Sequence, residues 1–356
     1  MAGFINRNIK RAIRLYFTFR TVNWIKFFQL HDKDADVVLL MRPQFSSIFK
    51  DTFEPDIILM GVLVKMGLRF RVYRGSEYGQ FQNKTIIYNA SYFMNEHGFQ
   101  NYSAFQTYVM QQLEYQGNRV FPRADEIVYW ENKEYMYAKF KELGIKHPDT
   151  SMFHSYEEFK QAKLKFPLLI KEAHSHAAEG VYKVNTPEDA ERLLTSEKFM
   201  SNNRVIIAQQ LLNMRKDLRV TVLGDEIVLH YWRTNPSDEW KPTSTSHGSG
   251  VDFVTFPEKW RSYFMEVNRK LNLKSGGYDY AWENDDLETE PICLEVSPTY
   301  QPNPPADITG RPYTYGQWKK KLLLKDSWDE AYTEFYFGIR YKVFESYFKE
   351  AGVLKK

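Results

Sequence analysis

The sequence lacks the features that mark several protein classes. Its one cysteine, Cys293, excludes a disulfide framework and a zinc site built from cysteines. No run of about 18 uncharged apolar residues occurs, so the sequence predicts no transmembrane span. Neither sign of charge dominates, because 48 basic side chains stand against 45 acidic ones. Nothing in this balance predicts a nucleic-acid partner.

The overall composition is that of a globular protein of more than one domain. Of the 356 residues, 43% are hydrophobic and 26% are charged, which excludes disorder, collagen and coiled coil. At roughly 150 residues per domain, the length predicts two to three domains. Aromatic residues are frequent, at 16%, and most of them must fill the core.

The N-terminal segment has an unusual charge pattern. Residues 4–30 contain six basic side chains and no acidic one, and apolar residues recur there at helical spacing. This pattern predicts a basic amphipathic helix, and peripheral contact with an anionic membrane surface is the less common of two interpretations. The alternative is a helix packed on the protein body with its basic side chains in water. Charged residues interrupt any apolar core, so no secretory leader is predicted and a cytoplasmic location is expected.

Strands and helices alternate along the rest of the chain. In the first part, strands are expected at 36–41, 70–73 and 85–88, and helices at 57–66 and 103–113, which predicts a small α/β domain. After it, further strands are expected at 166–171, 181–184, 204–208, 217–223, 226–232, 278–282 and 292–296. Helices are expected near 131–143, 186–194, 256–273 and 319–348.

Two acidic residues lie in apolar strands, where a carboxylate needs a partner. Asp279 lies in GGYDYAW and Glu295 in PICLEVSP. If these strands pair as a hairpin, the two carboxylates converge, and Mg²⁺ is a natural ligand for them because it prefers hard oxygen ligands and substrate phosphates. Alternatively, each acid forms a salt bridge with a neighbouring Lys or Arg.

Basic residues near strand ends suggest an anion site. Lys171 ends the strand PLLIK where a small-residue loop begins, so its ammonium and the loop amides are candidates for contact with a phosphate. The commoner alternative for such a lysine is solvent exposure. Arg219 and Arg233, on adjacent strands, suit anionic groups because guanidinium binds phosphate or carboxylate in bidentate fashion, although each could be a surface charge.

The order of these motifs resembles the ATP-grasp superfamily over residues 132–298. The family's first helix is resembled by NKEYMYAKFKELGIKHPDT. Its nucleotide-covering hairpin is resembled by FPLLIKEAHSHAAEGVYKV. The hinge strand and the D-x-R segment of RimK-type carboxylate–amine ligases are resembled by the stretch VIIAQQLLNMRKDLRVTVLGDEIVLHYWR. GGYDYAW and ICLEVSP resemble the metal-binding strands. A weaker similarity to synapsins rests on the loop at His174 and on YWRTNPSDEW.

The resemblance implies roles for individual residues. Lys133 and Lys171 would be the two lysines that bind the nucleotide, ATP. Gln210, Leu211 and Leu212 would face the adenine, and Asp217 would lie on the ribose side. Arg219 and Arg233 would hold the phosphates or the acyl phosphate, and Asp279 and Glu295 would ligate Mg²⁺, with Ser297 as the third metal residue.

Two positions depart from the family pattern. The asparagine expected after E-V is Ser297, a shorter and neutral ligand. The loop after Lys171 holds one glycine, Gly180, where the family has several, and its histidines, His174 and His176, are expected to make polar contacts within the loop. Both departures weaken the expected closure over the γ-phosphate.

The expected architecture is α/β and α+β: an ATP-grasp fold with an N-terminal α/β domain and two α+β halves that clamp the nucleotide. The predicted parts are a basic helix at 1–33, an α/β domain at 34–128, an ATP-grasp domain at 129–310 and a helical extension at 311–356.

The implied function is an ATP-dependent carboxylate–amine ligase that acts on small-molecule, saccharide or peptide substrates. Its oligomeric state is left open, with a homo-oligomer among the alternatives. The competing functions are a non-catalytic ATP-binding scaffold and an interaction module in which the terminal helices act.

Overall fold

The computed structural model of the chain describes residues 12, 15–41, 53–90, 102–175, 180–202, 205–235, 240–244, 249–302, 313–314 and 328–355. The chain divides into two compact units. Unit 1 consists of residues 1–127, 301–306 and 319–356, and unit 2 of residues 128–300 and 307–318. Within the described residues, no helix is both long and apolar enough to cross a bilayer.

Unit 1 is built on a parallel four-stranded sheet in the order β2-β1-β3-β4. The expected strands at 70–73 and 85–88 are confirmed, and the one expected at 36–41 is confirmed as β1. The two central strands, β1 and β3, are buried along their whole length, as is typical of parallel sheets. The strands are β1 (Val37–Leu40), β2 (Phe70–Tyr73), β3 (Thr85–Tyr88) and β4 (Arg119–Phe121). The helices are α2 (Trp24–Leu30), α3 (Phe53–Met66), α4 (Tyr102–Tyr115), α5 (Ala124–Ile127) and α12 (Trp328–Glu350).

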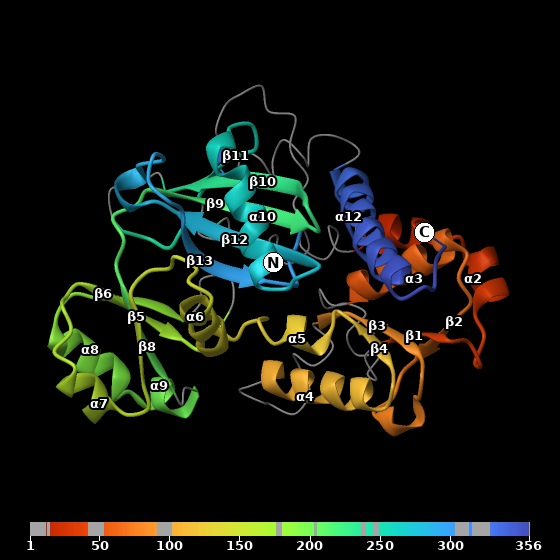
Figure 1. The fold of residues 1–356 in the computed structure, drawn as a ribbon, viewed down its shortest axis with the longest axis horizontal. Helices are drawn as coiled ribbons and strands as arrows, with labels where there is room; N and C mark the ends of the chain where they lie inside the picture. The colour runs from red at the N-terminus through yellow and green to blue at the C-terminus, as the bar shows by residue number, and fades with distance from the viewer. Residues whose placement is uncertain are drawn as a thin grey trace. The chain divides into compact units, whose positions relative to one another are not determined.

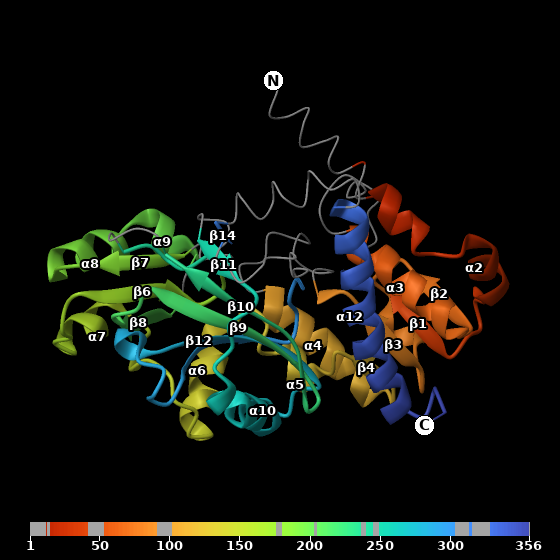
Figure 2. The same ribbon diagram turned by 90° about the horizontal axis from the view of Figure 1, so that it is seen from above.

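The helix α12 packs beside α3, and both views show the two side by side (Figures 1 and 2). Near its end, the Tyr347 ring stacks on Phe121 at 4.6 Å, and its hydroxyl donates to the buried carboxylate of Glu126. The C-terminal helix, expected as an extension, therefore contributes to the core of unit 1.

The basic N-terminal segment forms two helices in its described part. Residues 15–20 are helical, and α2 follows after a turn at 21–23, where the Asn23 side chain accepts a hydrogen bond from the amide of Lys26. Asparagine is a preferred helix cap, which explains the new start. One face of α2 packs on unit 1, since the Phe27 ring contacts Phe70 at 5.4 Å. The rest of the predicted amphipathic helix, at 1–11 and 13–14, lies outside the described residues.

Unit 2 contains two antiparallel sheets. The four-stranded sheet has the order β5-β8-β6-β7, and helices α7, α8 and α9 supply side chains to the core on one of its faces. Its strands are β5 (Thr150–Phe153), β6 (Leu168–Glu172), β7 (Val181–Val184) and β8 (Ile206–Gln210). Its helices are α7 (Tyr156–Gln161), α8 (Pro187–Leu194) and α9 (Glu197–Asn202). Thr186 caps α8 and Pro187 begins it, as the sequence predicts.

The six-stranded sheet has the order β13-β12-β9-β10-β11-β14. The helix α10 lies across it in Figure 1, and the side chains between them form the largest part of the core of unit 2. The strands are β9 (Lys216–Leu223), β10 (Glu226–Thr234), β11 (Gly250–Asp252), β12 (Ser275–Ala281), β13 (Ile292–Ser297) and β14 (Tyr313–Thr314). The remaining helices of unit 2 are α6 (Lys133–Glu142) and α10 (Arg261–Lys270).

Candidate functional site: a charged pocket in unit 2

Side-chain alternation in the six-stranded sheet separates a core face from a charged face. In β9, Leu218, Val220 and Val222 are fully buried in the core. Asp217 and Arg219 alternate with them and therefore project from the opposite face. The register sets Asp217 opposite Arg233 of β10 and Arg219 opposite Asp279 of β12. Opposite charges thus face each other across neighbouring strands.

These four side chains form a buried charge cluster. Arg219 binds Asp279 with two donors, its Nε and a terminal nitrogen, the latter at 2.8 Å. Arg233 binds Asp217, with its Nε 2.9 Å from a carboxylate oxygen, and also reaches Asp279 at 2.8 Å. Only 2% of Asp217 and 5% of Asp279 is exposed, so these charges depend on one another rather than on water. The salt-bridge alternative weighed for Asp279 is therefore what the structure contains.

Burial and the arginines act in opposite directions on the two aspartates. Burial raises the pKa of Asp279, but the guanidinium groups of Arg219 and Arg233 outweigh it and lower this pKa to about 2. For Asp217, burial has the largest effect and raises the pKa, with Arg233 opposing it. The Asp279 carboxyl is thus the more firmly ionised of the two.

Glu295 lies beside this cluster but is not held by it. The strands β12 and β13 pair as the expected hairpin, with Asp279 opposite Glu295. A β-bulge follows, because Tyr280 pairs with Cys293 and Leu294 is left over. Leu294 and Glu295 consequently both line the pocket, whereas Cys293 points into the core. No ion pair of Glu295 occurs among the residues described.

Lys133 approaches the pocket from the start of α6. The Asn132 side chain caps this helix, and the Lys133 ammonium donates to the carbonyl oxygen of Ser175 at 2.7 Å and to its hydroxyl at 3.0 Å. Burial lowers the pKa of Lys133, while the negative charge of Glu295 opposes this shift.

Lys171 reaches the pocket from β6. Its ammonium donates to the hydroxyl of Tyr137 at 3.0 Å. Burial lowers its pKa to about 8, against the attraction of Glu295 and Asp279. In the described part of the chain, neither Lys171 nor Lys133 forms an ion pair with a carboxylate. Two cations without anionic partners favour an anionic ligand.

The connection between the two sheets completes the pocket. It runs from Gln210, the last residue of β8, through Leu211 and Leu212 to β9. Apolar side chains from several elements form a wall of the pocket beside it, and a flat aromatic ring fits such a wall. We call these residues the apolar wall: Pro148, Leu169, Val181, Leu212, Met214 and Leu294.

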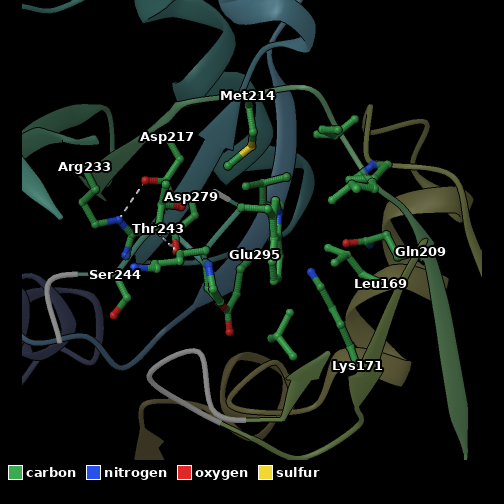
Figure 3. A pocket seen from close by; sticks show the side chains of 18 of the residues that line it. Leu169, Lys171, Gln209, Met214, Asp217, Arg233, Thr243, Ser244, Asp279 and Glu295 are labelled. Carbon is green, nitrogen blue, oxygen red and sulfur yellow. Dashed lines mark hydrogen bonds and ion pairs between the residues drawn. The ribbon is translucent and has the colours of Figure 1, made fainter. Parts of the chain in front are cut away.

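One cavity contains all but one of the residues to which the resemblance assigns a ligand-binding, metal-binding or catalytic role. Its lining includes Lys133, Lys171, Gln210, Leu211, Leu212, Asp217, Arg219, Arg233, Asp279 and Glu295. Figure 3 shows Lys171 and Gln209 on one side, with Asp217, Arg233 and Asp279 on the other and Glu295 between them. All of these residues belong to unit 2.

Ser297 is the exception. It lies opposite Gly277 at the end of β13 and is absent from the lining of the cavity. Its hydroxyl donates to the carbonyl oxygen of Thr299 and accepts from the Thr299 amide at 3.2 Å. The role of Ser297 as a metal ligand stays a prediction.

The loop after β6 is anchored at its start. His174 donates from Nδ1 to the carbonyl oxygen of Glu131 at 2.9 Å, a polar contact with a residue outside the loop. Residues 176–179, which include His176, lie outside the described part of the chain. Sequence analysis missed Ser175 and the segment 240–244, which also line the cavity. Ser175 followed Lys171 in a small-residue loop, and 240–244 belonged to a polar stretch, so composition alone gave no sign of either.

The carboxylates present suit a magnesium ion that is shared with a bound phosphate. No group of three or more His, Cys, Asp or Glu side chains gathers for a metal within the described ranges. Magnesium, however, is commonly bound through one or two carboxylates, substrate phosphates and water. Asp279 and Glu295 meet that requirement, because they are paired across β12 and β13 and line the same cavity.

Comparison with known proteins agrees with this geometry. Residues 131–287 match the RimK-like ATP-grasp domain family. This part of the chain is therefore similar to RimK-like ATP-grasp domains. The match includes both lysines, the hinge residues and Asp279, and it ends before Glu295 and Ser297.

Two solved structures and one curated protein are similar to the chain. A D-cycloserine synthetase has a TM-score of 0.53 at 12% identity, covering 85% of this chain and 99% of its own. D-alanine–D-alanine ligase from Bacillus anthracis, solved with ATP, has a TM-score of 0.50 at 12% identity, covering 88% and 100%. Human beta-citrylglutamate synthase B is 21% identical over 184 residues, 50% of this chain and 47% of that protein. The chain thus spans about half the length of the curated relatives it matches, and the structural likeness establishes the ATP-grasp fold.

Proposed function

We propose that this protein is an ATP-dependent carboxylate–amine ligase. The observation behind the proposal is the content of one cavity in unit 2. It combines two lysines without carboxylate partners, a pair of adjacent carboxylates, two arginines and an apolar wall. An aromatic base, a polyphosphate, a magnesium ion and a reacting acyl group each have suitable partners there.

The nucleotide contacts follow from the two kinds of lining. The adenine would lie against the apolar wall beside Gln210, Leu211 and Leu212. Lys133 and Lys171 would bind phosphate oxygens, since their ammonium groups lack anionic partners. Asp217 would accept a hydrogen bond from the ribose, because Arg233 leaves part of the acceptor capacity of its two oxygens free.

The chemistry assigned to the charged side is acyl activation followed by amide formation. A substrate carboxylate oxygen would attack the γ-phosphorus of ATP, forming an acyl phosphate and releasing ADP. An amine would then attack the acyl carbon, and phosphate would leave. Arg219 and Arg233 are placed to stabilise the oxyanion of that second step. Magnesium, held by Asp279 and Glu295, would supply Lewis-acid stabilisation of phosphate charge.

A non-catalytic ATP-binding protein is the alternative function. It is favoured by two observations: the Ser297 hydroxyl is engaged with Thr299, and both oxygens of Asp279 accept hydrogen bonds from an arginine. A protein in which these contacts persist would bind ATP through the lysines and hold it unreacted.

The identity of the substrates is proposed from the surface rather than from the pocket. The basic, aromatic segment at 4–30 suits a membrane-proximal acceptor, so we propose a cell-surface saccharide as substrate, modified at the cytoplasmic side of the inner membrane. A peptide or another small molecule is the alternative. A homo-oligomer is left as an alternative to the monomer.

A trapping experiment tests the ligase function. The protein is incubated with Mg²⁺, ATP and panels of saccharide acids, amino acids and peptides, and hydroxylamine is added to capture any acyl phosphate as a hydroxamate. We expect ADP release and hydroxamate formation with at least one carboxylate, and loss of both in Glu295→Gln. Tight ATP binding with no ADP from any combination would instead support the non-catalytic function.

A further inference from the structure

Unit 1 contains a cavity of its own, distinct from the nucleotide pocket. Its volume is about 590 Å³, and it lies among the helix at 15–20, α2, α3 and α12. Three cationic side chains line it, Arg20, Lys26 and Lys65, against one anionic side chain, Glu334. The excess of positive charge favours an anionic ligand.

The two lysines are available for such a ligand. The Lys65 ammonium lies over the rings of Phe337 at 5.2 Å and Tyr341 at 4.9 Å, which hold it by cation–π contacts. Neither Lys65 nor Lys26 forms an ion pair with a carboxylate among the described residues. Neither ammonium group is therefore engaged in a close contact with an acid in the described part of the chain.

Two helical glycines shape this cavity. A Cβ atom at Gly61 of α3 would meet Phe337 and Thr21 at 3.0 and 3.1 Å, so glycine permits close packing there. At Gly338 of α12, an added Cβ atom meets nothing within 4 Å. Glycine within a helix is destabilising relative to alanine, and packing does not require it at this position. Because glycine has no side chain, Gly338 leaves space in the lining of the cavity.

Exposed apolar side chains gather in the same segment that lines the cavity. Of the eight large hydrophobic side chains exposed among the described residues, four lie between positions 16 and 28. Ile25 and Phe28 are 75% and 74% exposed and share one face of α2, while Phe27 packs inward on Phe70. The surrounding segment, 4–30, has six basic residues and no acidic one.

We propose that this cavity binds the phosphate group of an anionic membrane lipid. Lys26, Lys65 and Arg20 contact the headgroup, and the exposed side chains Tyr16, Phe19, Ile25 and Phe28 enter the boundary of the acyl chains. A bilayer presents phosphate and apolar chains together, which matches this combination of charge and exposed apolar surface. A soluble phosphate ester would use the charges alone. The proposal does not depend on the ligase chemistry of unit 2.

Vesicle flotation with the full chain tests the proposal. Vesicles of phosphatidylcholine alone are compared with vesicles that also contain phosphatidylglycerol, at low and high salt. We expect binding to the anionic vesicles at least about tenfold tighter than to the neutral ones, weakened by salt. We also expect soluble glycerol phosphate, measured by calorimetry, to bind at least about tenfold more weakly than the lipid, because it gains nothing from the apolar side chains.

Matched variants separate the cavity from general surface charge. Lys26→Gln combined with Lys65→Gln should weaken vesicle binding about tenfold or more, whereas Lys139→Gln combined with Lys270→Gln, which removes the same charge from unit 2, should not. Gly338→Leu, which fills the cavity without changing charge, should also weaken it. Phe28→Ser should do so as well, in contrast to Tyr115→Ser, which alters an aromatic residue that is 90% exposed elsewhere. Unchanged thermal unfolding and ATP affinity verify that each variant is folded.

Several results would overturn the proposal. One is equal binding to neutral and anionic vesicles. Another is an equal loss of vesicle binding in the two double-lysine variants, since the general surface charge of the protein, and not the cavity, would then account for binding. A third is full vesicle binding by Gly338→Leu. Glycerol phosphate affinity equal to that for vesicles would assign the cavity to a soluble ligand, and self-association abolished by Phe28→Ser without vesicle binding would assign the apolar face to a second copy of the chain.

Discussion

The two sides of the pocket in unit 2 hold their positive charges in different ways. On the side of the four-stranded sheet, Lys133 and Lys171 donate to neutral oxygens of Ser175 and Tyr137, and burial lowers the pKa of both. On the side of the six-stranded sheet, Arg219 and Arg233 are bound to carboxylates. There, the carboxylates outweigh burial and raise the pKa of both arginines.

This difference shows which side is prepared for a ligand. Two ammonium groups held by neutral oxygens are destabilised by burial, and a bound phosphate would relieve that cost. The arginines are already neutralised, so a ligand there must compete with Asp217 and Asp279. The lysine side is thus preorganised for an anion, whereas the arginine side must rearrange to take part in the proposed reaction.

The largest expected effect comes from removing the charge of Asp279. Asp279→Asn leaves Arg219 without its carboxylate in a buried site, so the free energy of unfolding should fall by about 3 kcal/mol. Glu295→Gln should lower it by less than about 1 kcal/mol, because no ion pair of Glu295 is lost. Denaturant unfolding measures both. Equal destabilisation by the two variants would contradict the contrast between a bound and an unbound carboxylate.

Both carboxylate variants should nevertheless lose Mg²⁺-dependent turnover, by at least about 100-fold. Loss of turnover with little loss of stability is therefore the specific signature of Glu295→Gln. ADP release against Mg²⁺ concentration provides this comparison, and persistent turnover in both variants would remove the two residues from the metal site.

On the lysine side, Lys171→Ala should weaken ATP binding at least about tenfold, or 1.4 kcal/mol, because a charge near the phosphates is lost. Lys139→Ala, on the surface of α6 and paired with Glu142, is the matched control and should bind ATP normally. Calorimetry measures both affinities. If Lys171→Ala binds ATP as tightly as the control, Lys171 does not contact the nucleotide.

The lowered pKa of Lys171 has a consequence for stability against pH. Its folded-state pKa of about 8 lies below the ordinary value of 10.5, so between these values the unfolded chain binds more protons. The contribution of Lys171 to the free energy of unfolding should therefore rise with pH in this window, by up to about 1.4 kcal/mol per unit. The difference between the wild type and Lys171→Met isolates it. A difference that stays constant from pH 8 to 10.5 would contradict the shift.

The smallest expected effect concerns Ser297. An asparagine reaches further than the serine hydroxyl, which is engaged with Thr299. Ser297→Asn should therefore retain turnover and raise it a few-fold, on the order of threefold, when Mg²⁺ is limiting, since this metal tolerates several water ligands. ADP release at saturating and limiting Mg²⁺ measures the effect. A variant with reduced turnover at both concentrations would exclude a ligand role for this position.

Much of the site was predictable because its residues occur in regular strands. Alternation in β9 and β12 places Asp217, Arg219 and Asp279 on one face, and the expected pairing of the hairpin brings Glu295 beside Asp279. The separate halves of the domain also follow from strand patterns that the sequence displays. The short strand β4 (Arg119–Phe121) was not predicted, because three residues give no recognisable period.

The charge pairing and the break in the N-terminal helix required the structure. Arg219 and Arg233 could each have faced a ligand or solvent, and only the register with Asp279 and Asp217 decides between these outcomes. At Asn23, a side chain that caps α2 overrides an apolar pattern that continues through it. In both cases the structure is determined by a contact that one side chain makes with another group, and not by the spacing of apolar residues along the sequence.

The β-bulge in β13 makes this strand intolerant of changes in length. In a regular strand, Cys293 and Glu295 would point to the same side, and the carboxylate would then lie among core residues. The additional residue, Leu294, reverses the direction of Glu295 and adds an apolar contact to the pocket. Deleting one residue here would exchange the inner and outer faces of the strand from that point on. In relatives of this protein, insertions and deletions should therefore fall in the acidic connection at 283–290 and be absent from β13.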